Sequence, residues 1–183
     1  MKDVVAELRV DIKDLAAEDR AGWQPLAHSD RVRDLVGLNE AMQVELVRGL
    51  ASWDRVTAWA EDGAVTAVSW LKANTILAGP EAAGLVRLAR LYAQHRVVAA
   101  ALDGGDLTLA KARLLARAEK NREALFAECV AGFVHLARTL GNVEFGQVID
   151  QWIELVDDQP PPDDSIRGHD RRVGPYGHVR LGG

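Results

Sequence analysis

The chain has 183 residues, of which 48% are hydrophobic and 27% charged, and its formal net charge is −5. This length and balance suit a globular chain of about one domain with a sizeable core. The single cysteine, Cys129, excludes an intrachain disulfide framework and a cysteine-based zinc cluster. The N-terminus has no secretory apolar region, and no apolar run approaches the roughly 20 residues that span a membrane. We therefore expect a cytoplasmic protein without a membrane partner.

Apolar residues recur at steps of three and four along most of the chain, which predicts an all-α fold, a bundle of about six to seven helices. Ser29 or Asp30 is expected to cap the second helix, and Thr66, Thr108 and Asn142 the later ones, because short polar side chains accept bonds from free backbone N–H groups. The expected segments, in chain order, are 3–18, 30–60, 66–74, 79–104, 108 to about 120, 122–140 and 142 to about 156.

The apolar positions of these helices form the predicted core. The longest series lies on the second helix and comprises Leu35, Leu38, Met42, Leu46, Leu50, Trp53 and Val56. Trp53, Trp59 and Trp70 are expected to fill one junction between helices. Cys129 lies on the series that includes Phe126 and Phe133, which indicates a buried, inert thiol.

The helical domain is predicted to cover residues 1–158, and residues 159–183 are predicted to be a linker and an irregular tail. The sequence turns polar at Asp157, in a run with three prolines and four aspartates that ends at Asp164. Because this run lacks the glycine and glutamate of a calcium loop, a solvated linker is favoured over a cation site. His178 to Leu181 could form one short strand, for which no partner strand is visible.

Charge is unevenly distributed along the chain. Residues 64–122 carry nine basic and four acidic side chains, a net +5, whereas residues 1–63 and 123–183 each carry a net −5. Solvated helix faces are the favoured explanation, and a binding surface for phosphate is the alternative. The outline from Thr66 to about Leu102, two helices joined by a tight turn, is also typical of a helix-turn-helix. The candidate DNA contacts are Lys72, Arg87, Arg90, Lys111, Arg113 and Arg117.

No set of residues predicts catalysis, a metal site or a cofactor. None of the five histidines (His28, His95, His135, His169 and His178) has another histidine three or four positions away, and no HExxH motif is present. Gly104-Gly105 is not part of a phosphate-binding loop, because the chain has no GxxxxGK[ST] pattern.

The order of four sequence runs resembles a known family. They are similar to motifs of domain of unknown function 222 and extend from Asp62 to Leu71 (DGAVTAVSWL), from Leu85 to Arg90 (LVRLAR), from Val97 to Leu102 (VVAAAL) and from Asp106 to Arg113 (DLTLAKAR). This actinobacterial family is also called the 13E12 repeat family. The resemblance covers about residues 30–160.

The resemblance implies a helical N-terminal domain of unknown role. In longer relatives an HNH-type endonuclease domain follows it, often in mobile-element surroundings. This chain departs from the long form, because its tail has no His-His pair and no C-x-x-C motif. The resemblance therefore transfers no catalytic residue and implies a truncated nuclease or a fragment.

Three functions follow as expectations. The first is a non-catalytic helical module that binds DNA through the basic central region or binds a nuclease domain. The second is a protein-interaction or oligomerisation domain that uses the long second helix and the acidic first helix. The third is an endonuclease, which is truncated, completed by a partner subunit, or able to cut DNA through this fold itself.

Overall fold

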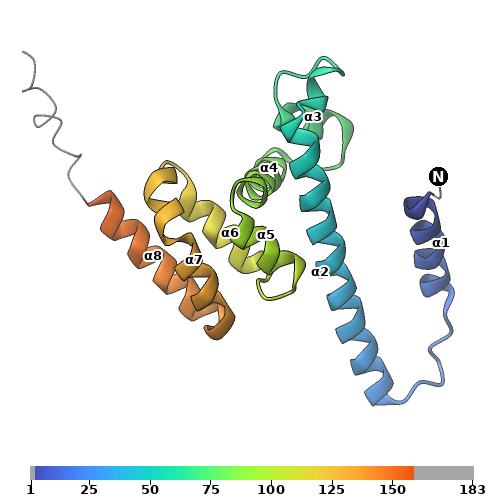
Figure 1. Cartoon of the computed structure of the whole chain (residues 1–183). Helices are drawn as coiled ribbons and strands as arrows, with labels where there is room; N and C mark the ends of the chain where they lie inside the picture. The colour runs from blue at the N-terminus through green and yellow to red at the C-terminus, as the bar shows by residue number, and fades with distance from the viewer. Residues whose placement is uncertain (1–2, 159–183) are drawn as a thin grey trace, which may run out of the picture.

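The computed structural model describes residues 3–158 of the chain (Figure 1). These residues form eight α-helices and one short 3-10 helix, η1, and no strand, which confirms the predicted all-α fold. The helices are α1 (Val4–Ala17), α2 (Pro25–Arg55), η1 (Ala58–Ala60), α3 (Ala67–Asn74), α4 (Gly79–Gln94), α5 (Arg96–Asp103), α6 (Leu109–Glu119), α7 (Glu123–Thr139) and α8 (Asn142–Asp157). The predicted linker beyond residue 158 and the expected strand at 178–181 lie outside the described residues.

Two of the predicted caps are confirmed. The Thr66 hydroxyl accepts a hydrogen bond from the Ser69 backbone N–H at 3.0 Å, and the Ser69 hydroxyl accepts one from the Thr66 N–H at 3.0 Å. This reciprocal arrangement is a capping box, and it fixes the start of α3. The Thr108 hydroxyl accepts the N–H of Lys111 at 3.4 Å and starts α6.

The predicted bounds of α2 are wrong at both ends. The helix begins at Pro25, whose fixed φ suits the first turn. Ser29 therefore lies inside the helix and donates its hydroxyl to the Pro25 carbonyl at 3.3 Å. At the other end the helix stops at Arg55, because Thr57 adopts a left-handed conformation with φ of 52°.

Three other boundaries also differ from the prediction. The segment predicted as one helix from 79 to 104 is two helices, because His95 is extended (φ −116°, ψ 96°) and separates α4 from α5. Gly141, and not Asn142, is the N-cap of α8. The same helix continues to Asp157, one residue beyond its expected end, and Arg122 donates to this carboxylate at 2.7 Å.

Helix α4 lies in the middle of the fold (Figure 1). It packs against α2, α3, α5 and α6. Its buried side chains are Ala82, Val86, Leu88, Ala89 and Leu91. They divide between two apolar clusters, one with α2 and α3 and the other with α5 to α8. Burial of α4 therefore joins the two halves of the molecule.

Aromatic side chains fill both clusters. The rings of Trp53 and Trp70 meet edge to face with their centroids 5.0 Å apart, and Trp59 packs against the same cluster. This confirms the predicted tryptophan junction. In the other cluster Phe126 is fully buried, and Trp152 lies edge-on to it at 6.1 Å.

The predicted apolar series of α2 divides in an unexpected way. Leu50 is buried and Trp53 half-buried. By contrast, Leu35, Leu38, Met42 and Leu46 are 40%, 55%, 47% and 47% exposed, and Val56 is also exposed. The face of α2 that packs against the bundle instead carries Val47, Leu50 and Ala51. Helix α2 therefore has two apolar faces, and the bundle covers one of them.

We predict that Phe126→Ala lowers the free energy of unfolding by about 3–5 kcal/mol, because it removes a fully buried ring and leaves a cavity. Leu125→Ala is the matched control on the same helix, since Leu125 is 41% exposed and should lose far less. Urea unfolding followed by circular dichroism measures both. Equal losses of unfolding free energy in the two variants would contradict the burial of Phe126 and the exposure of Leu125 on α7.

Candidate functional site

The six predicted phosphate contacts do not share one environment. Lys72 and Arg87 have exposed side chains with no ion pair or side-chain hydrogen bond among the described residues. Arg90 donates from Nε to Asp54 Oδ2 at 2.7 Å. Arg113 donates to the Gln43 side chain at 3.0 Å, and Arg117 forms an ion pair with Asp150. Four of the six cations, Arg90, Lys111, Arg113 and Arg117, are thus engaged within the chain.

Lys111 is the most firmly held of the four. Its ammonium donates to the carbonyls of Ala137 and Leu140, at 2.6 and 2.7 Å. These carbonyls lie at the C-terminal end of α7, where backbone acceptors lack helical partners and the helix dipole is negative. Lys111 therefore closes the end of α7 and joins it to α6.

We predict that Lys111→Ala destabilises the fold by about 1–3 kcal/mol, because two carbonyls lose a charged donor. Lys72→Ala is the matched control and should change stability by less than about 0.5 kcal/mol, as is usual for an exposed position without partners. Thermal and urea unfolding measure both variants. An unchanged Lys111→Ala protein would mean that this lysine is free to bind a ligand.

The ion pair between Arg90 and Asp54 joins α4 to α2. The Asp54 side chain is 12% exposed, and it also accepts the Trp59 indole N–H at 3.0 Å. The hydrogen bond from Arg90 lowers the pKa of Asp54, partial burial opposes this, and the bond from Trp59 lowers the pKa further. Asp54 therefore carries its charge in the folded chain, and Arg90 is its counter-ion.

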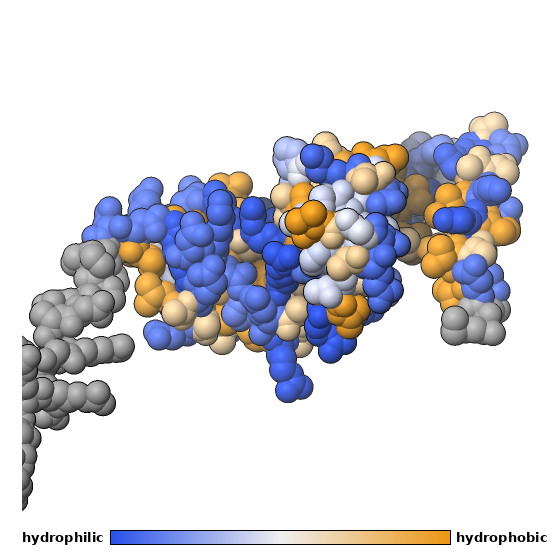
Figure 2. All heavy atoms as spheres, turned by 90° about the horizontal axis from the view of Figure 1, so that it is seen from above, coloured by the Kyte–Doolittle hydropathy of each residue, from blue (hydrophilic) through white to orange (hydrophobic). Residues whose placement is uncertain are grey.

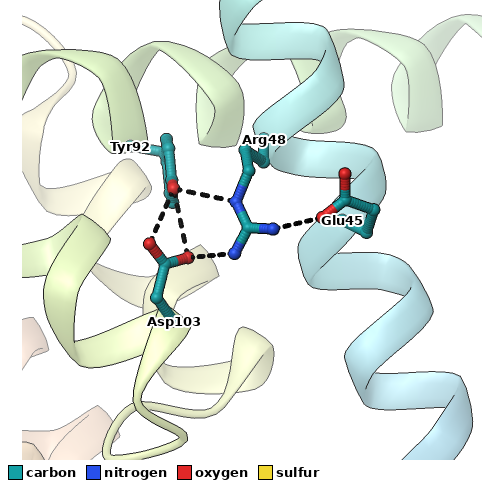
Figure 3. Close-up of polar contacts among 4 residues, drawn as sticks. All are labelled: Glu45, Arg48, Tyr92 and Asp103. Carbon is teal, nitrogen blue, oxygen red and sulfur yellow. Dashed lines mark hydrogen bonds and ion pairs between the residues drawn. The ribbon is translucent and has the colours of Figure 1, made fainter.

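A second polar cluster joins three helices (Figure 3). Arg48 of α2 donates from Nη2 to Asp103 of α5 at 2.8 Å and from Nε to the Tyr92 hydroxyl of α4 at 3.3 Å. The Tyr92 hydroxyl donates to Asp103, with oxygen distances of 2.9 and 3.1 Å, and Glu45 forms an ion pair with Arg48. The hydrogen bond from Arg48 lowers the pKa of Asp103, and the bonds to Asp103 and Tyr92 raise the pKa of Arg48.

This cluster borders a groove of about 460 Å³ between α2 and the turn after α5. The charged groups of the Arg48 cluster bond to one another. Glu40, in the wall of the groove, accepts a hydrogen bond from the Leu109 backbone N–H at 2.6 Å. The arrangement holds α2 against α4 and α5. The sequence prediction missed the cluster, because Arg48 and Asp103 are 55 positions apart and belong to no local pattern.

The histidines and the cysteine, for which the sequence predicts no catalytic role, are likewise dispersed. His95 Nε2 lies 2.6 Å from Glu119 Oε1, and the two side chains are 13% and 9% exposed. His28 packs on the Trp23 ring, His135 is exposed, and Cys129 is half-buried against the α7 core. Within residues 3–158 no three His, Cys, Asp or Glu side chains are grouped as metal ligands. His169 and His178 lie outside the described residues.

A wide apolar opening lies between α1 and α2, and we call it the α1–α2 groove. Its volume is about 750 Å³. Helix α1 buries none of its side chains, and Figure 2 shows this helix at the right of the molecule with apolar atoms uncovered along it. The apolar lining residues are Leu8, Ile12, Leu15, Ala16, Leu35, Leu38, Ala41 and Met42.

A second apolar hollow, of about 490 Å³, continues along α2 toward α3. Met42 lines both, and Leu46, Leu50, Trp53 and Trp70 line the second. The apolar surface thus runs along α2 from Leu35 to Trp53, a distance of about 27 Å at 1.5 Å per residue. A surface of this extent on a folded chain is typical of a contact site.

Comparison of the chain with known proteins identified no relative. No protein-family model, curated protein or solved structure matches the chain. The resemblance to the 13E12 repeat family therefore stays a prediction. Among the described helices, none has both the length and the apolar character needed to cross a membrane.

Proposed function

We propose that this chain is a non-catalytic helical module that acts by binding another protein, with the α1–α2 groove as its docking surface. One observation carries the proposal: Leu35, Leu38, Met42 and Leu46 are uncovered on a helix whose other apolar face is buried. Apolar side chains in register along one helix face are the usual docking site for a second helix. Burial of such a face contributes about 25 cal/mol per Å².

The charges around the groove limit the kind of partner. Helix α1 carries Asp11, Asp14 and, just after its end, Glu18, which forms an ion pair with Arg31. Surface helices that bind anionic lipid are instead rich in lysine and arginine on the polar face. The charged residues that line the groove itself are Asp11, Arg20 and Arg31. This mixed rim has no basic cluster and therefore favours a protein partner over an anionic lipid surface.

We predict that the diluted chain binds the apolar dye ANS and that Leu38→Glu reduces the fluorescence severalfold, because a charge then lies in the groove. Val36→Glu is the matched control: Val36 lies on the same helix, is 64% exposed and does not line the groove. It should leave the signal unchanged. Absence of ANS fluorescence from the wild-type chain at dilution would remove the proposal of an open docking surface.

DNA binding is the second candidate function, and the net +5 of residues 64–122 supports it. The exposed cations of this segment that have no partner among the described residues are Lys72, Arg87, Arg96 and Lys120. These four side chains, rather than Arg90, Lys111 and Arg117, would then supply the phosphate contacts. The resemblance to the 13E12 repeat family is consistent with this candidate, since its longer members carry a nuclease domain.

We predict that, if DNA binds, the logarithm of the binding constant falls linearly with the logarithm of salt concentration, with a slope of about −0.9 per phosphate contact. The double variant Lys72→Glu, Arg87→Glu should weaken binding at low salt and reduce this slope by about two contacts. Lys13→Glu is the control, because Lys13 is an exposed lysine outside the basic segment. A gel-shift titration measures these effects, and no binding at low salt would exclude this function.

A further inference from the structure

We propose that the occupant of the α1–α2 groove is the α1–α2 hairpin of a second copy of this chain. The two α2 helices would lie antiparallel, and α1 of each copy would pack along the pair to complete a four-helix bundle. This inference rests on the proposed docking function and adds the identity and register of the partner.

The α1–α2 hairpin is incomplete as a packed unit. In α1, Val5 and Ile12 are 61% and 53% exposed, and no side chain of the helix is buried. A 14-residue helix is marginal in water without tertiary packing. Two helices with apolar faces bury them fully when a second hairpin supplies the other half of the core, as in four-helix bundles.

Helix α1 can adjust to a second hairpin. The ion pair between Glu18 and Arg31 joins the end of α1 to the first turns of α2. Because α1 buries no side chain, its distance from α2 can change without loss of core packing. The groove of about 750 Å³ is the space that the incoming side chains would fill.

The exposed apolar residues of α2 that line the groove and the adjoining hollow, Leu35, Leu38, Met42 and Leu46, are self-complementary. Their spacing, 35, 38, 42 and 46, is close to symmetric about the Glu40–Ala41 bond. A two-fold axis there places Leu38 opposite Met42 of the second copy and Leu35 opposite Leu46 of the second copy. A closed two-fold interface requires such a surface, because each contact must occur twice.

Charge supports the same register. Asp34 is exposed and has no ion pair among the described residues. On a helical wheel it lies along the same edge of the apolar series as Arg48, whose side chain is 47% exposed. In the antiparallel arrangement this edge meets itself, and Asp34 lies opposite Arg48 of the second copy. The pair occurs twice, and Arg48 has donors left beyond its bonds to Asp103, Tyr92 and Glu45.

The test is sedimentation velocity of the full chain over a wide range of concentration. The expected result is a molar mass that rises from 19.9 kDa toward twice that value. The double variant Leu38→Glu, Met42→Glu should weaken dimer formation by about a hundredfold or more, because four charges enter one apolar interface. Val36→Glu, on the same helix but outside the groove, should dimerise like the wild type.

A second variant tests the register. Asp34→Arg should weaken the dimer by about tenfold, because two attractive pairs become repulsive. Glu61→Arg makes the same charge change at an exposed site away from the groove and should have no effect. Circular dichroism checks that all four variants keep the wild-type helix content.

The outcomes separate this inference from the proposed function. A wild-type chain that stays monomeric at every concentration, yet binds ANS at dilution, overturns the second copy as partner and leaves the docking surface standing. A dimer that survives Leu38→Glu, Met42→Glu overturns the interface. If Leu38→Glu, Met42→Glu abolishes the dimer but Asp34→Arg leaves the dimer affinity unchanged, the antiparallel register is overturned.

Discussion

Burial of α4 is the constraint on which the rest of the fold depends. Val86, Ala89 and Leu91 are at most 3% exposed, and the helix packs against four other helices. An apolar helix in this position must present different side chains to each neighbour, and its small residues let α2 and α3 approach closely. The ion pair Arg90–Asp54 and the cluster of Arg48, Tyr92 and Asp103 then fix α2 and α5 around it.

The same constraint decides how the basic central segment is used. Because α4 and α6 are packed into the middle of the fold, three of their basic side chains lie close to acidic or carbonyl groups of α2, α7 and α8. Arg90, Lys111 and Arg117 each bind such a group. Of the nine basic side chains of residues 64–122, three thus pair with aspartates (Arg90, Arg117 and Arg122) and two bond to neutral acceptors (Lys111 and Arg113). The other four, Lys72, Arg87, Arg96 and Lys120, stay exposed without a partner among the described residues. The continuous apolar surface along α2, and not a lack of free cations, is the reason that we propose protein docking first.

The α1–α2 hairpin is the part of the molecule that the bundle does not complete. The C-terminal half of α2 is anchored by Val47, Leu50 and Ala51, whereas its N-terminal half extends beyond the bundle with Leu35 and Leu38 uncovered (Figure 1). Keeping apolar groups in water is unfavourable. The exposed apolar side chains on one face of α2 therefore support a binding surface for a partner on that face. Their near-symmetric spacing supports a second copy of the chain as the partner.

The sequence by itself determined the helices and several of their ends, because these depend on local chemistry. Periodicity of three and four defines the helices, and the hydroxyls of Thr66 and Thr108 cap their starts within three residues. The tryptophan junction also followed from periodicity.

Tertiary structure alone decided which face of α2 is buried, since two apolar series compete on one helix. It also decided the break at His95, whose partner Glu119 is 24 positions away, and the pairing of Arg48 with Asp103. Such contacts form only when distant segments fold together, so no local pattern predicts them.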